Sequence, residues 1–348
     1  MAQRAHSGKN VNRSRAVKSR GKKKRIYEMR KRRRRKRILF VLVSACFALM
    51  AFKIKDTNVQ IEEVKAALER AQAVYEAERQ QLLDTVADHA GGNGQSAYVY
   101  AESIAAAEVS KPVRRTRAEA VERLKELGND NDEIARIAEN EAEYPEELLM
   151  ALANNPEMSD FAANYREYIK EPPADELSRL TAGEKEQEYP LFLQWDRRWG
   201  YKPYGESCIG LAGCGPTCLS MALFYLTGDA SCTPDKVAEY SMENGFYVEG
   251  TGTAWALMEN VPFHKLKITK PSLSRTSIAG ALDSGCVIIC AVGSGDFTTA
   301  GHFVVIYGYD DDGFMVNDPN CAARSRKRWT YDEIAGQIKS IWAYGLDK

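Results

Sequence analysis

The chain has 348 residues, 44% of them apolar, so it is longer than an ordinary single domain and can bury a core of considerable size. Its net charge of zero conceals two regions of opposite sign: residues 1–37 contain 18 Lys and Arg and one acid, Glu28, whereas the rest contain 30 basic and 47 acidic residues. This asymmetry excludes an evenly charged chain and favours a protein that occupies two compartments.

An apolar segment follows the basic arm of residues 1–37. Its fifteen uncharged residues end at Phe52 and would span about 23 Å as a helix, against about 30 Å for the core of a bilayer. The long side chains of Arg37 and Lys53 can reach the lipid headgroups and cover the difference. We therefore expect a transmembrane helix at 38–53 in the cell membrane, with the basic arm in the cytoplasm and the rest of the chain extracellular.

Two other routes of export compete with this membrane helix. A cleaved signal peptide would need a small-x-small site after the apolar run, and none is found there. Lipoprotein processing at Cys46 is the second alternative. In either case the C-terminal part of the chain lies outside. The basic arm is expected to contact anionic lipid, and no nucleic acid partner is expected because only Tyr27 places an aromatic ring among its charges.

Residues 56–90 carry a weak heptad pattern, in which apolar or small residues recur three or four positions apart. These residues are Ile61, Val64, Leu68, Ala71, Tyr75 and Leu82. The pattern predicts a stalk helix about 50 Å long, either alone or as a parallel coiled coil that holds a homodimer. The glycine-rich start of residues 91–116 predicts a linker over that range.

Residues 117–170 predict a helical section made of short amphipathic helices. The apolar faces are expected at Ala118, Val121, Leu124 and Leu127, at Ile134, Ile137 and Ala138, at Leu148, Leu149, Ala151 and Leu152, and at Phe161, Tyr165 and Tyr168. The pair Pro172 and Pro173 and the polar residues after it predict a second linker over 171–188.

Residues 189–348 show a different pattern, with short helical and strand segments in alternation, and predict an α+β domain. Helices are expected at 214–226, from Thr233, after Ser274 and at 331–338, and strands at 286–292, 303–309, 314–317 and 341–344. The acidic turn at 310–313 is expected to join two of these strands into an antiparallel hairpin.

The run 212–217 (AGCGPT) places Cys214 at the start of an apolar helix. A sulfur in the first turn of a helix faces unpaired backbone N–H groups and the positive end of the helix dipole, which favour its anion. Pro216 suits a first turn because its missing N–H loses no partner there. The glycines on either side leave space for a substrate backbone to approach the sulfur. Cys214 is therefore the candidate nucleophile.

A nucleophilic thiol needs a base, and the sequence contains four histidines. His6 lies in the basic arm and His89 at the end of the stalk, so His264 and His302 remain. His302 opens an apolar strand after the loop 293–296 (GSGD), whereas His264 has the surroundings of a surface residue. We expect His302 to be the general base.

The imidazole needs a group that orients it, and the oxyanion formed on attack needs donors. Asp318 ends the strand that pairs with the His302 strand, so it is the expected orienting acid, with Asn317 and Asn320 as alternatives. The side-chain amide of Gln194 and the backbone N–H of Cys214 are the expected oxyanion donors.

Four motifs in this order resemble the papain-like cysteine peptidases of the bacteriocin-processing, double-glycine leader type, in a form without a transporter. They are 190–196 (PLFLQWD), 213–217 (GCGPT), 301–303 (GHF) and 317–319 (NDP), within residues 189–345. The resemblance implies a papain-like domain that hydrolyses a peptide or protein substrate through an acyl-enzyme thioester, without a metal or cofactor. It places the oxyanion glutamine, nucleophile, base and orienting acid on Gln194, Cys214, His302 and Asp318.

Three alternatives stay open from the sequence. Six further cysteines follow residue 200, enough for up to three disulfides, although Cys286 and Cys290 would share one strand face as buried thiols. A zinc site made by Cys208, Cys214, Cys218 and His302 is the rival chemistry. The rival functions are a papain-fold hydrolase or acyl transferase acting on cell-wall peptides, and a module that binds peptides without catalysis.

Overall fold

The computed structural model describes residues 111–347. The basic arm 1–37, the expected membrane helix 38–53 with Cys46, the stalk 56–90 and most of the linker 91–116 lie outside the described residues. Within 111–347, no helix combines the length and the apolar character needed to cross a bilayer.

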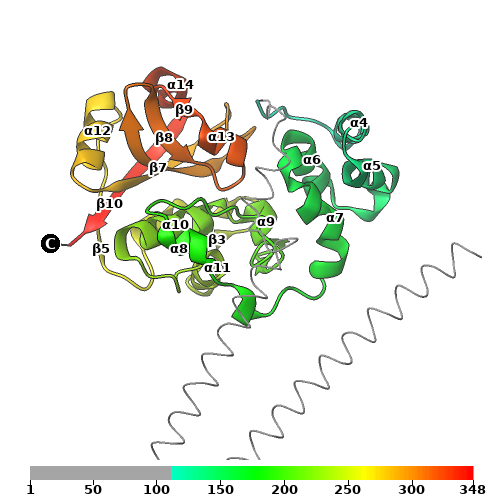
Figure 1. Ribbon diagram of the computed structural model, residues 1–348, viewed down its shortest axis with the longest axis horizontal. Helices are drawn as coiled ribbons and strands as arrows, with labels where there is room; N and C mark the ends of the chain where they lie inside the picture. Colours follow the sequence, from blue (N-terminus) through cyan, green and yellow to red (C-terminus); the bar gives the residue numbers. More distant parts are fainter. Residues whose placement is uncertain (1–110, 348) are drawn as a thin grey trace, which may run out of the picture. The chain divides into compact units, whose positions relative to one another are not determined.

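The helical section consists of short helices joined by tight connections (Figure 1). They are α4 (Arg117–Leu127), α5 (Asp132–Glu139), the 3₁₀ helix η1 (Glu141–Glu143), α6 (Glu146–Asn154), the 3₁₀ helix η2 (Pro156–Met158) and α7 (Ser159–Tyr168). Thr116 and Glu119 begin α4 as a reciprocal capping box, and the Asn131 side chain caps α5. The expected helices are therefore confirmed, and side-chain caps begin two of them, α4 and α5.

The apolar face of α4 differs from the expectation at one position. Ala118 is exposed, and Ala120 is buried together with Val121 and Leu124. Ala120 and Leu124 are four residues apart, so they lie on the same side of the helix, and this side packs against α5 and α6. The buried face of α5 is the one predicted, whereas in α6 Ala153 is buried in place of the predicted Ala151.

Residues 171–188, expected as a linker, contain the 3₁₀ helix η3 (Asp175–Leu177) and the short helix α8 (Ala182–Glu186). A buried ion-pair network attaches α8 to the next segment, because Arg198 donates to Glu184 at 2.7 Å and to Asp196 at 2.7 Å. Burial lowers the pKa of Arg198, but the two carboxylates outweigh this effect and raise it above its ordinary value. Replacing one residue of such a network leaves a buried charge without its partner, which lowers the free energy of unfolding strongly.

The C-terminal section contains a six-stranded antiparallel sheet, in the order β5-β10-β6-β7-β8-β9 (Figure 1). Its strands are β5 (Leu266–Thr269), β6 (Val287–Val292), β7 (His302–Asp310), β8 (Gly313–Asn317), β9 (Arg328–Trp329) and β10 (Ile338–Leu346). Two small hairpins precede it: β1 (Pro203–Tyr204) with β2 (Ser207–Cys208), and β3 (Tyr247–Val248) with β4 (Gly252–Thr253). The α+β expectation is confirmed.

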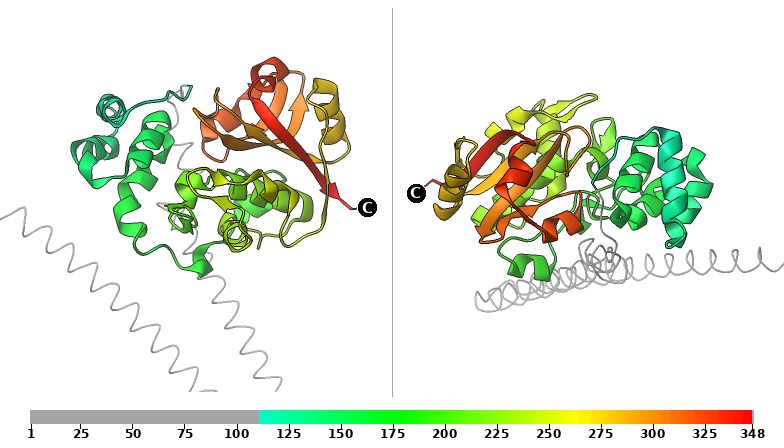
Figure 2. Two further views of the ribbon diagram at one scale, coloured as in Figure 1. Left: turned by 180° about the vertical axis from the view of Figure 1, so that it is seen from behind. Right: turned by 90° about the horizontal axis from the view of Figure 1, so that it is seen from above.

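Helices cover both faces of the sheet (Figure 2). The helices of this section are α9 (Ile209–Ala212), α10 (Cys214–Thr227), α11 (Pro234–Glu243), η4 (Trp255–Glu259), α12 (Arg275–Asp283), α13 (Ala322–Arg326) and α14 (Tyr331–Ala335). The apolar helix α10 packs on one face and α12 and α14 on the other. Every residue of β6 is buried because this strand lies in the middle of the sheet.

The hairpin predicted at 310–313 joins β7 and β8, with Asp310 paired to Gly313. The register of this pair shifts between Ile306 and Gly308, so β7 contains a β-bulge. The last helix is shorter and the last strand longer than expected. Gly336 ends α14 at Ala335, and β10 begins at Ile338 because that residue pairs with Val292.

The helical section and the C-terminal section share one hydrophobic core. The ring of Phe161 in α7 stacks on Tyr201, with centroids 4.5 Å apart, and the Tyr201 hydroxyl donates to the Phe161 carbonyl at 3.0 Å. Asp160 and Arg197 form an ion pair beside them. The helical section is therefore packed on the C-terminal section as one unit.

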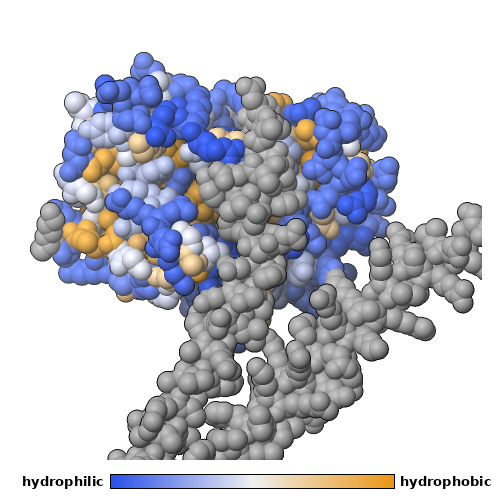
Figure 3. Space-filling view, in the orientation of Figure 1, coloured by the Kyte–Doolittle hydropathy of each residue, from blue (hydrophilic) through white to orange (hydrophobic). Residues whose placement is uncertain are grey.

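In the view of Figure 3, the described surface is mainly hydrophilic and its apolar residues form separate patches. The most exposed large apolar side chains of the described residues include Phe263, Leu346 and Trp255. Trp255 packs its edge against Trp342 with ring centroids 5.9 Å apart.

Candidate active site

Cys214 is the first residue of α10 and is partly exposed. Gly213 precedes the helix, and Pro216 lies in its first turn, as the sequence predicted. Residues 215–224 are all buried, because α10 is surrounded by the sheet, α9 and α11. The buried helix fixes the position of the sulfur at its exposed end.

The glycines beside Cys214 lie in close contact with other parts of the protein. A Cβ atom on Gly215 would lie 2.6 Å from the Thr253 Cγ2 atom, and one on Gly213 would lie 2.6 Å from the Ile209 carbonyl oxygen. Both glycines thus allow the first turn of α10 to pack closely on protein atoms. The expectation that they leave space for a substrate backbone stays a prediction.

His302 and Asp318 meet at the end of the β7–β8 pair. The His302 Nε2 atom and the Asp318 Oδ1 atom are 2.7 Å apart, a hydrogen bond between two buried side chains. The antiparallel pairing of β7 and β8 brings Asp318 back to the start of β7, as expected. The imidazole is therefore held by the acid predicted for it.

The imidazole also interacts with Cys214. Burial lowers the pKa of His302, but attraction to the Asp318 carboxylate and to Cys214, with a side-chain hydrogen bond to each, raises it to about 10. One ring nitrogen is taken by Asp318, so the other faces the sulfur. The structure thus brings the thiol and the carboxylate into contact with the same imidazole ring.

Asp318 is completely buried and has several donors around it. The Arg324 guanidinium donates to Asp318 Oδ2 at 3.2 Å and the Asn320 backbone N–H donates to Oδ1 at 2.8 Å. Burial raises the pKa of Asp318, but His302 and Arg324 outweigh burial and hold it below its ordinary value. The carboxylate is therefore kept charged beside the imidazole.

Gln194 lies between the segments that carry the other site residues. Its backbone N–H donates to the Pro319 carbonyl at 2.7 Å, and its side-chain amide donates to the Gly210 carbonyl at 2.9 Å, in the helix just before Cys214. The buried Gln194 Oε1 atom has no hydrogen-bond partner within residues 111–347. The side chain is thus fixed next to α9, with one amide hydrogen still available.

The helical section supports the segment that carries Asp318. The Glu157 carboxylate accepts the backbone N–H groups of Ala322 at 2.8 Å and Ala323 at 2.9 Å, at the start of α13. The Asn155 side chain donates to the Asn320 carbonyl, which also accepts from Trp195 at 2.9 Å. Glu157 is 1% exposed, so these bonds are shielded from water. The loop after β8 is consequently held from two sides.

The alternatives left open by the sequence are resolved by contacts. Asn317 donates to the Tyr225 hydroxyl at 2.8 Å, and Asn320 meets Asp318 through its backbone, so neither side chain orients the ring. His264 forms its bond with Asp229, away from His302. The role of Arg324 beside Asp318 was not predicted, because an arginine six residues after an aspartate is not a recognised motif.

The cysteines argue against two further alternatives from the sequence, the disulfides and the zinc site. All seven cysteines of the described part are free thiols, so the disulfides considered from the sequence do not occur there. Cys286 and Cys290 both face the second core cluster, as expected for one strand face. The rival zinc set of Cys208, Cys214, Cys218 and His302 is wrong, because these residues do not form a ligand cluster within 111–347.

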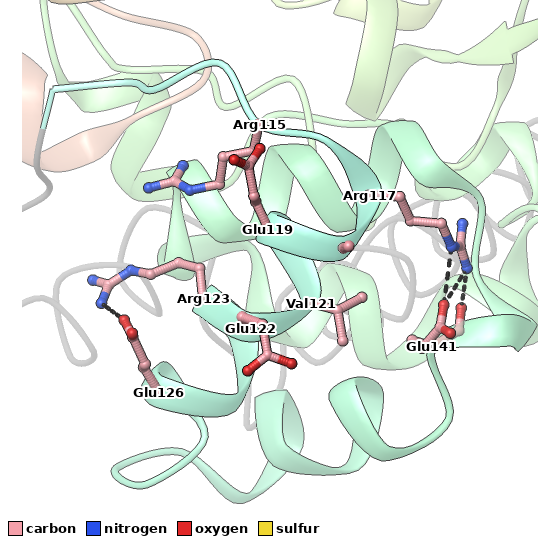
Figure 4. Close-up of a pocket in the computed structure, with 9 residues that line it drawn as sticks. Arg115, Arg117, Glu119, Val121, Glu122, Arg123, Glu126 and Glu141 are labelled. Atoms are coloured by element: carbon pink, nitrogen blue, oxygen red, sulfur yellow. Dashed lines mark hydrogen bonds and ion pairs between the residues drawn. The ribbon is translucent and has the colours of Figure 1, made fainter.

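A surface hollow of about 790 Å³ lies along α4, and its lining includes none of the site residues described above (Figure 4). Basic and acidic side chains alternate around it, and two ion pairs, Arg117 with Glu141 and Arg123 with Glu126, neutralise much of its charge. A second hollow of about 480 Å³ borders Asn320 and Arg324. Neither is lined by Cys214 or His302, so we assign no reaction to them.

The comparisons with known proteins agree with the motifs. Residues 186–345 match the model of the Peptidase_C39 like family. The peptidase domain of Streptococcus ComA, described as a bi-functional ABC transporter involved in a quorum sensing pathway, is 15% identical, with a TM-score of 0.30 over 39% of this chain and 93% of that chain. A putative C39-like peptidase from Bacillus anthracis is 13% identical, with a TM-score of 0.29 over 45% and 94%.

No curated protein matches the sequence. The two structural scores are low and carry no argument of their own, so the family match has to be weighed together with the motifs and the geometry of the site. On that basis, residues 186–345 form a domain similar to the cysteine peptidases of the Peptidase_C39 like family, which confirms the resemblance found in the sequence.

Proposed function

We propose that this chain is a cysteine peptidase that hydrolyses peptide bonds through a thioester on Cys214. The observation that carries the proposal is the placement of a partly exposed thiol at the start of α10, against an imidazole that Asp318 holds at 2.7 Å. A helix start favours the thiolate, and a buried carboxylate favours the imidazolium, so the reactive ion pair is stabilised at both ends.

The first half of the reaction is acylation. The Cys214 thiolate attacks the peptide carbonyl carbon, and the negative charge moves to the carbonyl oxygen. The backbone N–H of Cys214 and the remaining amide hydrogen of Gln194 are the proposed donors to this oxyanion. As the oxyanion collapses, the C–N bond breaks and the His302 imidazolium gives its proton to the leaving amine. A thioester and a neutral imidazole remain.

The second half is hydrolysis of the thioester. Neutral His302 takes a proton from water as the water oxygen attacks the thioester carbonyl. The C–S bond then breaks, which releases a carboxylic acid and restores the thiolate and imidazolium pair. Asp318 keeps its charge throughout and holds the ring in position, while Arg324 stabilises that charge.

Trp255 is the proposed contact for a substrate side chain. It follows two residues after Thr253, which touches Gly215 in the first turn of α10, and its side chain is half exposed. A half-exposed tryptophan two residues from that contact offers apolar area to a bound peptide. We expect Trp255→Ala to raise KM for peptides while kcat changes little.

The decisive experiment compares two thiols. Cys214 and Cys286 are both partly exposed, so an iodoacetamide-type reagent can reach either. We expect Cys214 to be labelled much faster, and Cys214→Ala to abolish hydrolysis of a peptide library, whereas Cys286→Ala leaves both unchanged. Equal labelling of the two thiols, or full hydrolysis by Cys214→Ala, would refute the proposal.

The site of action is proposed from the sequence. A membrane helix at 38–53 after a basic arm would hold the catalytic section extracellularly, so its substrates would be extracellular peptides or proteins. Protease protection of intact cells tests this arrangement: the catalytic section should be digested from outside. Protection of residues 111–347 in intact cells would contradict it.

A further inference from the structure

A second group of reactive side chains lies at the far end of α10. Asp229 and Cys232 belong to the connection between α10 and α11, and His264 belongs to the loop before β5. One carboxylate oxygen, the sulfur and one imidazole nitrogen all lie within 4.8 Å of one another. Within residues 111–347 this is the one group of three such residues with that spacing.

The carboxylate is fixed in place before any ligand binds. Asp229 Oδ1 accepts the Ser231 backbone N–H at 2.9 Å and the Ser231 hydroxyl at 2.6 Å. Asp229 Oδ2 is left to face His264 Nε2 at 2.7 Å. One oxygen is thus held by its own loop and the other is directed toward the imidazole, an arrangement in which outer hydrogen bonds orient a metal ligand.

Hydrogen bonds also fix the backbone of Cys232, which carries the sulfur. Cys232 is buried, and its backbone carbonyl accepts the hydroxyl of Ser220 in the middle of α10. Its backbone N–H lies 3.3 Å from the Asp229 carbonyl oxygen. The loop therefore turns the two side chains to the same point, with the sulfur on the inner side.

His264 reaches this point through a strained residue. Phe263 has a φ of 66°, and within the described residues it is the one non-glycine residue with positive φ. That conformation costs about 1 kcal/mol or more for a residue with a bulky side chain, so the surrounding structure must hold it. The His264 side chain is about one-third exposed, which leaves a path from solvent.

We infer that Asp229, Cys232 and His264 bind a zinc-type divalent cation. A carboxylate oxygen, a thiolate and an imidazole form a donor set suited to zinc. Ligands about 2.0–2.3 Å from a tetrahedral ion are about 3.3–3.8 Å from each other, so the three side chains need to move only slightly. Water would fill the fourth position.

Binding changes two protons in a defined way. The Cys232 thiol gives its proton to solvent and the sulfur binds as thiolate. His264 must release the hydrogen bond from Nε2, so the neutral ring carries its proton on Nδ1 while Nε2 binds the ion. The carboxylate exchanges the imidazole for the metal and keeps its bonds to Ser231.

The ion would be structural and separate from the thiol chemistry. Helix α10 has 14 residues and is about 20 Å long, with Cys214 at one end and Asp229 just beyond the other. A bound ion would join the α10–α11 connection to the loop before β5. It would thereby anchor the C-terminal end of α10, the helix whose first residue is Cys214.

The test uses cobalt as a spectroscopic substitute for zinc in the full chain. All proteins carry Cys214→Ala, so the result does not depend on the proposed peptidase activity. We expect one equivalent of cobalt to produce a sulfur-to-metal charge-transfer band that zinc removes. The band should be lost in Cys232→Ser and in His264→Gln, and retained in the matched control Cys286→Ser.

Two outcomes would overturn the inference. One is a cobalt band that persists in both Cys232→Ser and His264→Gln. The other is the absence of stoichiometric cobalt and zinc binding by the parent protein, in which case Asp229 and His264 form a structural ion pair only. Since His264 is partly exposed, His264→Gln is expected to fold even if replacement of the buried Cys232 prevents folding.

Discussion

Glu157 is expected to be a positioning residue for the catalytic acid, and its removal tests whether the helical section belongs to the active site. Glu157→Ala leaves the N–H groups of Ala322 and Ala323 without their acceptor at the start of α13. Each unsatisfied buried donor costs about 1–3 kcal/mol, so we expect the free energy of unfolding to fall by about 2–6 kcal/mol in urea titrations.

The same variant should impair catalysis at temperatures where it is still folded. The loop that loses its support begins at Asp318, so we expect kcat to fall more than KM rises, and the alkaline limb of the kcat/KM profile to move to lower pH as the His302–Asp318 contact loosens. Glu157→Gln keeps one acceptor oxygen and should give an intermediate loss. Glu146→Ala, on the exposed side of α6, is the matched control.

The reasoning is wrong if Glu157→Ala unfolds at the same urea concentration as the parent protein. It is also wrong if stability falls but the pH profile of the folded variant is unchanged, since that result would make Glu157 a stability residue without influence on Asp318.

Three further outcomes are expected. The pKa of His302 is raised from 6.5 to about 10, so the stability gained from its imidazolium is complete below pH 6.5 and is lost as pH rises through about 10. We expect kcat/KM to fall in the same alkaline range. Asp318→Asn should shift both declines to lower pH, which is measured by following unfolding and rate as functions of pH. Arg198→Met should cost about 3–5 kcal/mol in urea unfolding, and an unchanged midpoint would show that its buried network is not stabilising. Gly215→Ala should cost about 1–3 kcal/mol in the same assay, with partial recovery when Thr253→Ala is added, and no recovery would place the strain elsewhere.

The strongest sequence signals were local ones. The start of α10 and the β7–β8 hairpin were predictable because glycine, proline and period-2 patterns act over a few residues. His302 and Asp318 could be paired from the sequence because a hairpin returns the chain beside itself. Gln194 was expected as an oxyanion donor, although its position depends on a contact with Gly210 that no short pattern reveals.

The contacts that escaped prediction join residues far apart in the chain. Glu157 meets Ala322 across 165 positions, and Asn155 meets Asn320 across the same separation. A glutamate after a proline has the pattern of a solvated turn, so its burial follows only from the docking of the helical section. The contact between Asp229 and His264 was likewise not predictable, because each residue has an ordinary surface sequence around it.

The bulge in β7 determines on which side of the sheet the catalytic acid points. Beyond the bulge Val305 pairs with Asn317, and the same register places Asp318 opposite Val304, two residues from His302 and therefore on its side. If the register of Gly308 and Met315 continued along the whole hairpin, Asp318 would instead align with Val305 and project to the other side. The one-residue shift of register within the hairpin thus places the acid and the base on the same side of the sheet, where their side chains can meet.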